Sequence, residues 1–140
     1  MQKLPSLLKP SLKTKFHIDY DWWKSQDRNW RNALQGFLCA EHQAVFSQGE
    51  DYRDVDMVDP VTAEVTQGDA LMDTLINHCA KQEGFLGASA PLVDSVFKVF
   101  LVNGNQPLTS VEISDLINKP ADTILRTIGS ARVYKGIRPL

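Results

Sequence analysis

The stretch that decides the fold is residues 91–138, which read PLVDSVFKVFLVNGNQPLTSVEISDLINKPADTILRTIGSARVYKGIR. Its apolar residues first recur with a helical period from Leu92 to Leu101, and Pro91 suits the first turn of that helix. Asn103-Gly104-Asn105 then ends the helix, because glycine adopts the left-handed backbone conformation without strain. The stretch therefore opens with one amphipathic helix and a tight stop.

Two shorter helices follow. The segment Thr109-Ser110-Val111-Glu112 has the pattern of a capping box, in which a hydroxyl and a carboxylate satisfy free amides at a helix start. Asn118-Lys119-Pro120 ends this helix, and a third helix runs up to Gly129. The residues expected to face inward are Ile113, Leu116 and Ile117 in the second helix and Ile124, Leu125 and Ile128 in the third. The segment from Ala131 to Arg138 then predicts a terminal strand.

Helix, extended linker, helix, turn, helix and strand is the order of elements in a winged helix-turn-helix. The run LTSVEISDLINKPADTILRTI resembles the second and third helices of that superfamily, over about the last fifty residues of the chain. After ARVYKGIRPL there is room for one strand only, so we expect a shortened wing. Members of this superfamily bind DNA, bind proteins or dimerise, and the resemblance leaves these functions open.

Composition and charge limit the class of protein. The chain has 140 residues, of which 43% are hydrophobic and 23% charged, so it can form a core. Its formal net charge is −2, yet residues 16–84 hold five basic and thirteen acidic residues while both ends are net positive. The sequence contains no run of eighteen apolar residues, and its first fifteen residues lack the apolar core of a signal peptide. We therefore expect a cytoplasmic protein without a membrane partner.

The predicted organisation is a mainly helical α+β protein in three regions. Residues 1–15 form a basic arm of proline and lysine, residues 16–86 a helical N-terminal region, and residues 87–140 the winged-helix-like region. Asp59-Pro60 lies between two β-favouring segments, which predicts one β-hairpin near residues 52–67.

Other elements are expected in the N-terminal region. Alternation over Phe16–Tyr20 predicts a short strand or an extended entry. A helix follows, interrupted or bent at Gly36 and continuing to Phe46, and another runs from Asp69 to about Gln82. The core stripe of the first helix comprises Trp23, Trp30, Leu34 and Leu38.

The candidate nucleic-acid contacts lie on the third helix, the turn before it and the terminal strand. They are Lys119, Thr123, Arg126, Thr127, Arg132, Lys135 and Arg138. Thr123 and Arg126 could reach base edges or phosphates, whereas the other basic groups could contact phosphates. Asp122, at the start of the third helix, would repel a phosphate.

Two cysteines and two histidines form a second candidate site, for structural zinc. Cys39 and His42 stand three residues apart on a predicted helix, so both side chains can face one point. His78 and Cys79 are adjacent on another predicted helix, where neighbouring side chains point about 100° apart, which argues against a shared metal. A zinc site, a disulfide, a hydrogen-bonded contact and ordinary buried thiols therefore stay open, and no other cofactor is expected.

Catalytic motifs are missing from the sequence. It contains neither a phosphate-binding loop, nor a dinucleotide fingerprint, nor a nucleophile elbow. We therefore expect a non-enzymatic DNA-binding or transcription-associated regulator. The alternative is an adaptor or dimerisation module, whose partner is another protein or a second copy of the chain.

Overall fold

A computed structural model describes residues 9–48, 54–59, 61–87 and 90–140. Its strands are β1 (Lys15–Ile18), β2 (Asp54–Val58), β3 (Val65–Asp69), β4 (Leu108–Thr109) and β5 (Ile137–Pro139). Its helices are α1 (Tyr20–Gln26), α2 (Trp30–Gln35), α3 (Ala40–Gln48), α4 (Ala70–Asn77), the 3-10 helix η2 (Cys79–Lys81), α5 (Leu92–Val102), α6 (Ser110–Ile117) and α7 (Ala121–Ile128). The predicted α+β class is confirmed, and about half of the chain is helical.

The three helices expected in the last fifty residues are present as α5, α6 and α7. The capping box at the start of α6 is confirmed: Thr109 Oγ1 accepts a hydrogen bond from the Glu112 amide at 3.2 Å. In return, the Thr109 amide donates to Glu112 Oε1 at 2.9 Å. Asn118 ends α6 in the left-handed conformation, with φ of 56°.

Two details of this stretch differ from the prediction. Leu116 does not face inward but is 53% exposed, because the buried face of α6 is centred on Ser110 and Ile113 and leaves Leu116 at its edge. The terminal strand is shorter than expected, since β5 begins only at Ile137. Before it, Lys135 and Gly136 both have positive φ and form a tight turn that the Ile137 amide closes on the Tyr134 carbonyl at 2.9 Å.

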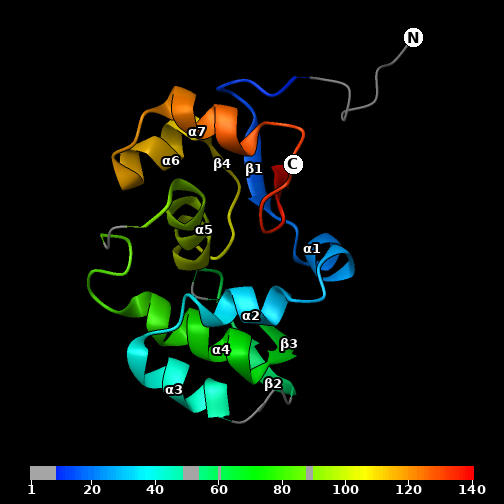
Figure 1. Ribbon diagram of the computed structural model, residues 1–140, viewed down its shortest axis with the longest axis vertical. Helices are drawn as coiled ribbons and strands as arrows, with labels where there is room; N and C mark the ends of the chain where they lie inside the picture. Colours follow the sequence, from blue (N-terminus) through cyan, green and yellow to red (C-terminus); the bar gives the residue numbers. More distant parts are fainter. Residues whose placement is uncertain (1–8, 49–53, 60, 88–89) are drawn as a thin grey trace.

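The three-stranded antiparallel sheet has the order β4-β1-β5. Its central strand comes from the N-terminal end of the described chain: Phe16 lies opposite Leu108, and His17 lies opposite Arg138. Figure 1 shows β1 between β4 and the C-terminus, next to α6 and α7. The strand expected at Phe16–Tyr20 is thus confirmed over its first residues and belongs to the same layer as the C-terminal strands.

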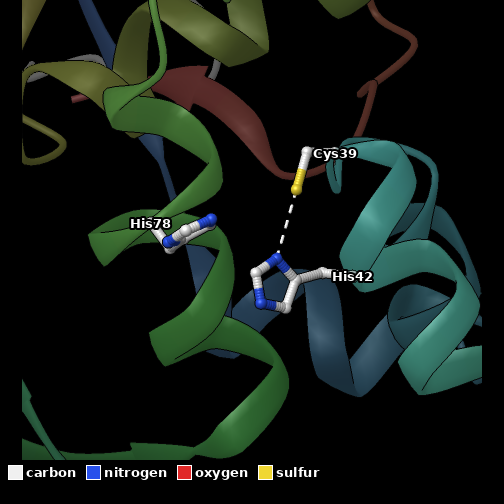
Figure 2. A group of neighbouring side chains, drawn as sticks. All are labelled: Cys39, His42 and His78. Carbon is white, nitrogen blue, oxygen red and sulfur yellow. Dashed lines mark hydrogen bonds between the residues drawn. The ribbon is translucent and has the colours of Figure 1, made fainter.

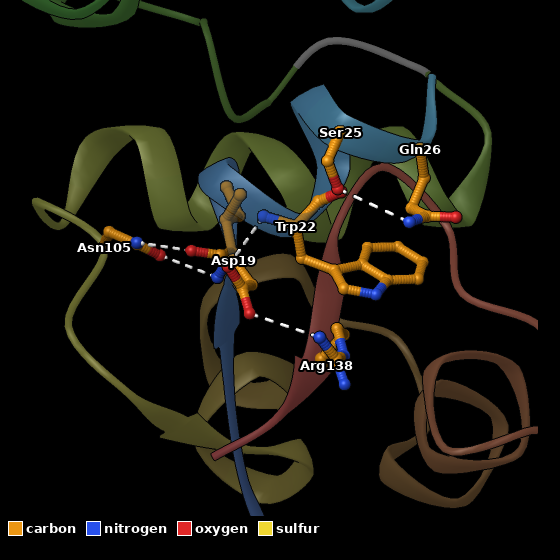
Figure 3. A network of polar contacts seen from close by, with 7 residues as sticks. Asp19, Trp22, Ser25, Gln26, Asn105 and Arg138 are labelled. Carbon is orange, nitrogen blue, oxygen red and sulfur yellow. Dashed lines mark hydrogen bonds and ion pairs between the residues drawn. The ribbon is translucent and has the colours of Figure 1, made fainter.

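Two polar side chains fix the end of β1 (Figure 3). Asn105, in the loop after α5, accepts a hydrogen bond from the Ile18 amide and donates one to the Ile18 carbonyl, both at 2.8 Å. Asp19 caps α1 by accepting from the Trp22 amide at 3.1 Å, and its other carboxylate oxygen pairs with Arg138 at 3.2 Å. The junction between β1 and α1 is therefore held to both α5 and β5.

The first long helix of the prediction is broken into α1, α2 and α3. Asp27 ends α1, because its carboxylate accepts hydrogen bonds from the Trp23 indole at 3.3 Å and from the Asn29 amide at 2.8 Å. Gly36 ends α2, as the sequence indicated. Trp23, Leu34 and Leu38 are buried as predicted, whereas Trp30 is half-buried with the cationic groups of Lys24 and Arg31 over its ring.

The predicted hairpin is present as β2 and β3, paired with Asp54 opposite Asp69 and Val58 opposite Val65. Asp59 shapes the turn, since its carboxylate accepts from the Val61 amide at 2.8 Å and from the Thr62 amide at 3.0 Å. Pro60, the second residue of the predicted turn, and residues 52–53 lie outside the described residues.

The core is organised on α5, which lies between the two ends of the molecule (Figure 1). Phe97 of α5 is completely buried, with its ring stacked on Phe37 at 4.9 Å and edge-on to Trp23 at 5.6 Å. One continuous cluster of buried residues thus joins the sheet with α6 and α7 to the helices near the hairpin.

Candidate nucleic-acid interface and cysteine-histidine cluster

The outer face of α7 presents one polar pair. Ile124 and Ile128 are buried and Leu125 is half-buried, so the residues between them point outward. Arg126 is exposed, and its Nη2 lies 3.4 Å from Thr123 Oγ1. The Thr127 hydroxyl donates to the Thr123 carbonyl at 2.9 Å, so it is used within the helix.

Two more of the predicted cations are exposed near α7. Lys119 lies in the turn between α6 and α7, and Arg132 lies in the bend that follows α7. The Arg132 guanidinium lies 5.0 Å from the centre of the Tyr134 ring, which holds it without neutralising its charge. Together with Arg126, these residues give positive charge before, on and after α7.

Lys135 and Arg138 behave differently from the other candidates, because both pair with carboxylates of other elements. Lys135 Nζ lies 3.9 Å from Asp94 Oδ1 at the start of α5. Arg138 pairs with Asp19 at 3.2 Å, and its guanidinium lies 4.7 Å from the centre of the Trp22 ring. Their charges are therefore partly balanced within the fold.

The sequence-based set of contacts omitted the lysines that precede β1. A Cβ atom at Gly129 would lie only 3.3 Å from Pro10 Cβ, so the segment around Pro10 passes the C-terminal end of α7. Lys9, Lys13 and Lys15 of this segment are all exposed. The sequence signal for including this segment was its run of lysines without an acidic residue. Only the position of β1 in the sheet places the segment beside the end of α7.

Basic and acidic residues lie at different ends of the molecule. Residues 9–19 and 90–140, which contribute the three-stranded sheet, α5, α6 and α7, hold nine basic and five acidic residues. The described residues between 20 and 87, which include the hairpin, hold four basic and ten acidic residues. Since α6 and α7 lie at one end of the long axis and the hairpin at the other (Figure 1), the molecule has a basic end and an acidic end.

The second candidate site lies between α3 and the end of α4. Cys39 directly precedes α3, and its Sγ lies 3.1 Å from His42 Nδ1 (Figure 2). Cys79 Sγ lies 3.5 Å from Cys39 Sγ and 3.8 Å from His42 Nδ1. Potential ligand atoms of Cys39, His42 and His78 all lie within 4.8 Å of one another. All four predicted residues therefore contribute to one cluster.

The two thiols are in opposite environments. The side-chain contact with His42, assisted by the His42 backbone amide, lowers the pKa of Cys39 to about 7. Burial raises the pKa of the Cys79 thiol to about 11. The contact with His42 therefore favours the thiolate form of Cys39, whereas burial favours the protonated form of Cys79.

Neighbouring side chains on one helix point apart, which argued against a metal shared by His78 and Cys79. The structure removes this argument, because the two residues do not lie on one helix. The predicted helix from Asp69 to Gln82 is wrong in its second half, because α4 ends at Asn77. His78 has φ of −129° and ψ of −65°, outside the helical conformation, and Cys79 starts the separate helix η2. The change of chain direction at His78 allows both side chains to approach Cys39 and His42.

Comparisons with models of protein families, with curated proteins and with solved structures found no match to this chain. Among the described residues, the helices are too short or too polar to cross a membrane. Function must therefore be inferred from the two sites themselves.

Proposed function

We propose that this protein binds DNA through its basic end, with α7 against the duplex. The observation that carries the proposal is the separation of charge along the long axis, with nine basic against five acidic residues in the segments that form the basic end. Duplex DNA attracts such a surface because every phosphate is negatively charged, and the acidic hairpin at the opposite end stays away from it.

The exposed cations around α7 divide into two roles. Lys119, Arg132 and the lysines before β1 suit phosphate contacts, which position the protein on the duplex. Arg126 with Thr123 forms the outward pair on α7, and arginine is the side chain best suited to guanine edges in the major groove. Asp122 at the N-terminus of α7 leaves Lys119 as the phosphate contact at that end, and the other phosphate contacts are placed toward the C-terminal end, where the segment around Pro10 passes.

The sheet supports a winged-helix-like arrangement with a short connection into β5. The central position in the sheet is filled by β1, and the tight turn at Lys135-Gly136 supplies a short connection into β5. In this arrangement the segment before β1 takes part in binding, together with the short wing expected from the sequence. Lys135 and Arg138 then have structural roles, since they pair with Asp94 and Asp19.

Fluorescence anisotropy with a labelled DNA duplex, measured over a range of salt concentrations, tests the proposal. Each lost phosphate contact should reduce the slope of log K against log salt by about 0.9, so Arg126→Ala/Arg132→Ala should lower it by about 1 through Arg132. The loss of the base contact of Arg126 should weaken binding further without a second change in slope. The matched control is Arg28→Ala/Lys81→Ala, which removes two exposed positive charges from the acidic part of the chain. Equal effects of the two double variants, or no binding at micromolar protein in low salt, would refute the proposal.

The runner-up function is a protein-interaction or dimerisation module, and one feature of the hairpin favours it. Val58 and Val65 lie opposite each other and are 46% and 60% exposed, next to the acidic residues Asp56 and Glu64. An apolar pair bordered by carboxylates suits a partner with basic and apolar groups. If the unaltered protein binds no DNA in the anisotropy experiment, protein interaction or dimerisation becomes the leading function.

A further inference from the structure

We propose that Cys39, His42, His78 and Cys79 form a structural zinc site that joins α3 to the end of α4. The proposal is independent of DNA binding, because these residues lie outside the segments that form the basic end. It depends on the distances between the donor atoms, on the chemistry of the donors and on the position of the cluster between two helices.

Three donor atoms already have the spacing of one face of a zinc tetrahedron. With bonds of about 2.3 Å to sulfur and about 2.0 Å to nitrogen, two sulfurs are separated by about 3.8 Å, and a sulfur from a nitrogen by about 3.5 Å. The Cys39–Cys79 Sγ distance is 3.5 Å, and the distances from His42 Nδ1 to these sulfurs are 3.1 and 3.8 Å. Small shifts would bring all three atoms into contact with one ion.

His78 supplies the fourth ligand. Its ring lies edge-on to that of His42, with 4.4 Å between the ring centres and an interplanar angle of 72°. Figure 2 shows His42 pointing its Nδ1 at Cys39 Sγ while the His78 ring enters from α4 on the other side. His78 is exposed, and its Nε2 lies 3.3 Å from Gln82 Nε2, so a rotation of the His78 side chain that gives up this contact would bring a ring nitrogen toward the ion.

The donor types select the metal. Two thiols and two imidazoles suit zinc, whereas magnesium and calcium require oxygen ligands. On binding, each thiol loses a proton to solvent and each imidazole coordinates through a neutral nitrogen. Cys39 and His42 are three residues apart and face one point, and the break in the helix at His78 brings the second pair to the same place.

The location gives the metal a structural role. Among the described side chains of α3, only Phe46 is buried, so apolar packing holds this helix at one position. The cluster lies at the other end of α3 and connects positions 40 residues apart in the chain. A bound ion would therefore tie the start of α3, which follows the buried Leu38, to the end of α4.

Cobalt substitution tests the site directly. The full chain is purified under reducing conditions, freed of metal with a chelator and titrated with Co²⁺, whose tetrahedral thiolate complexes absorb in the visible and near ultraviolet. We expect one Co²⁺ per chain with d–d and thiolate charge-transfer bands, and displacement of Co²⁺ by one equivalent of Zn²⁺. Cys39→Ser and Cys79→Ser should weaken binding by at least about 100-fold, and His78→Ala by about tenfold.

His17→Ala is the matched control, because His17 lies on β1 away from the cluster and its loss should leave the Co²⁺ spectrum unchanged. A measurement on the unaltered chain removes any dependence on the folding of the variants: Zn²⁺ should protect both thiols from iodoacetamide at least tenfold. Reduced protein that binds no Co²⁺, or thiols that Zn²⁺ does not protect, would overturn the proposal. Thiols that become reactive only after reductant is added would assign the pair to a disulfide and overturn it as well.

Discussion

Replacement of Asn105 by alanine should remove the two hydrogen bonds that hold the end of β1 to the loop after α5. Asn105 makes two hydrogen bonds of 2.8 Å to the backbone of Ile18, whose side chain is only 2% exposed. The substitution leaves an amide and a carbonyl without their partner in a part-buried position, at a cost of about 1 kcal/mol each. Asn105 also has φ of 59°, a conformation that disfavours alanine by about 1 kcal/mol.

The expected loss of unfolding free energy for Asn105→Ala is therefore about 3 kcal/mol, equivalent to a fall in Tm of about 10 °C for a chain of this size. Urea unfolding under reducing conditions, followed by tryptophan fluorescence, measures it, since Trp23 is buried in the core. Asn105→Gly should lose only about 2 kcal/mol, because glycine tolerates the positive φ.

Asn103→Ala is the matched control for the loss of two hydrogen bonds. Asn103 also makes two, with the Gln106 amide at 3.2 Å and the Gln106 carbonyl at 3.1 Å, but both are exposed to solvent. Water can replace the lost partner there, so we expect a cost below about 1 kcal/mol. If Asn105→Ala and Asn103→Ala destabilise the protein equally, the reasoning from buried backbone groups is wrong.

Two further predictions concern a turn and a helix start. Gly136→Ala should cost about 3 kcal/mol, because φ is +77° and a Cβ would lie 2.9 Å from Trp23 Cβ and 3.0 Å from the Asp19 carbonyl oxygen. Gly84→Ala, at φ of +84° with nothing within 4 Å, should cost only about 1 kcal/mol, and similar urea midpoints for both variants would contradict the steric argument. The Thr109 amide and hydroxyl hold the pKa of Glu112 below its usual value, so the ionised carboxylate stabilises the folded state above the unfolded-state pKa. The stability advantage of the natural protein over Glu112→Gln should therefore shrink as pH falls from 7 to about 3, and a constant difference over this range would exclude the effect.

The local elements of the C-terminal half could be predicted because short-range chemistry defines them. Thr109 and Glu112 satisfy amides within one turn, and Asn118 ends α6 by its own backbone conformation. Each signal acts within a few residues and needs no distant partner. The same is true of the turn at Asp59, whose carboxylate binds the amides that directly follow it.

The candidate interface could be predicted only in part. The side chains of Arg126 and Thr123 lie on the same outer face of α7 because the two residues are three positions apart on one helix. That Arg138 pairs with Asp19 could not be predicted, since the two residues are 119 positions apart and only the pairing of β1 with β5 brings them together. The segment around Pro10 likewise passes the C-terminal end of α7 only in the folded chain.

The sequence by itself determined the α+β class, the three C-terminal helices with their cap, and the hairpin. It identified the two cysteines and two histidines as candidates, while their spacing argued against one shared site. Only the tertiary structure decided that β1 occupies the centre of the C-terminal sheet and that α4 ends at Asn77, so that Cys79 meets Cys39. Helix periods and caps are set by neighbours in the chain, whereas strand partners, and helix ends without a local stop signal, depend on which buried groups find a partner after the whole chain has packed.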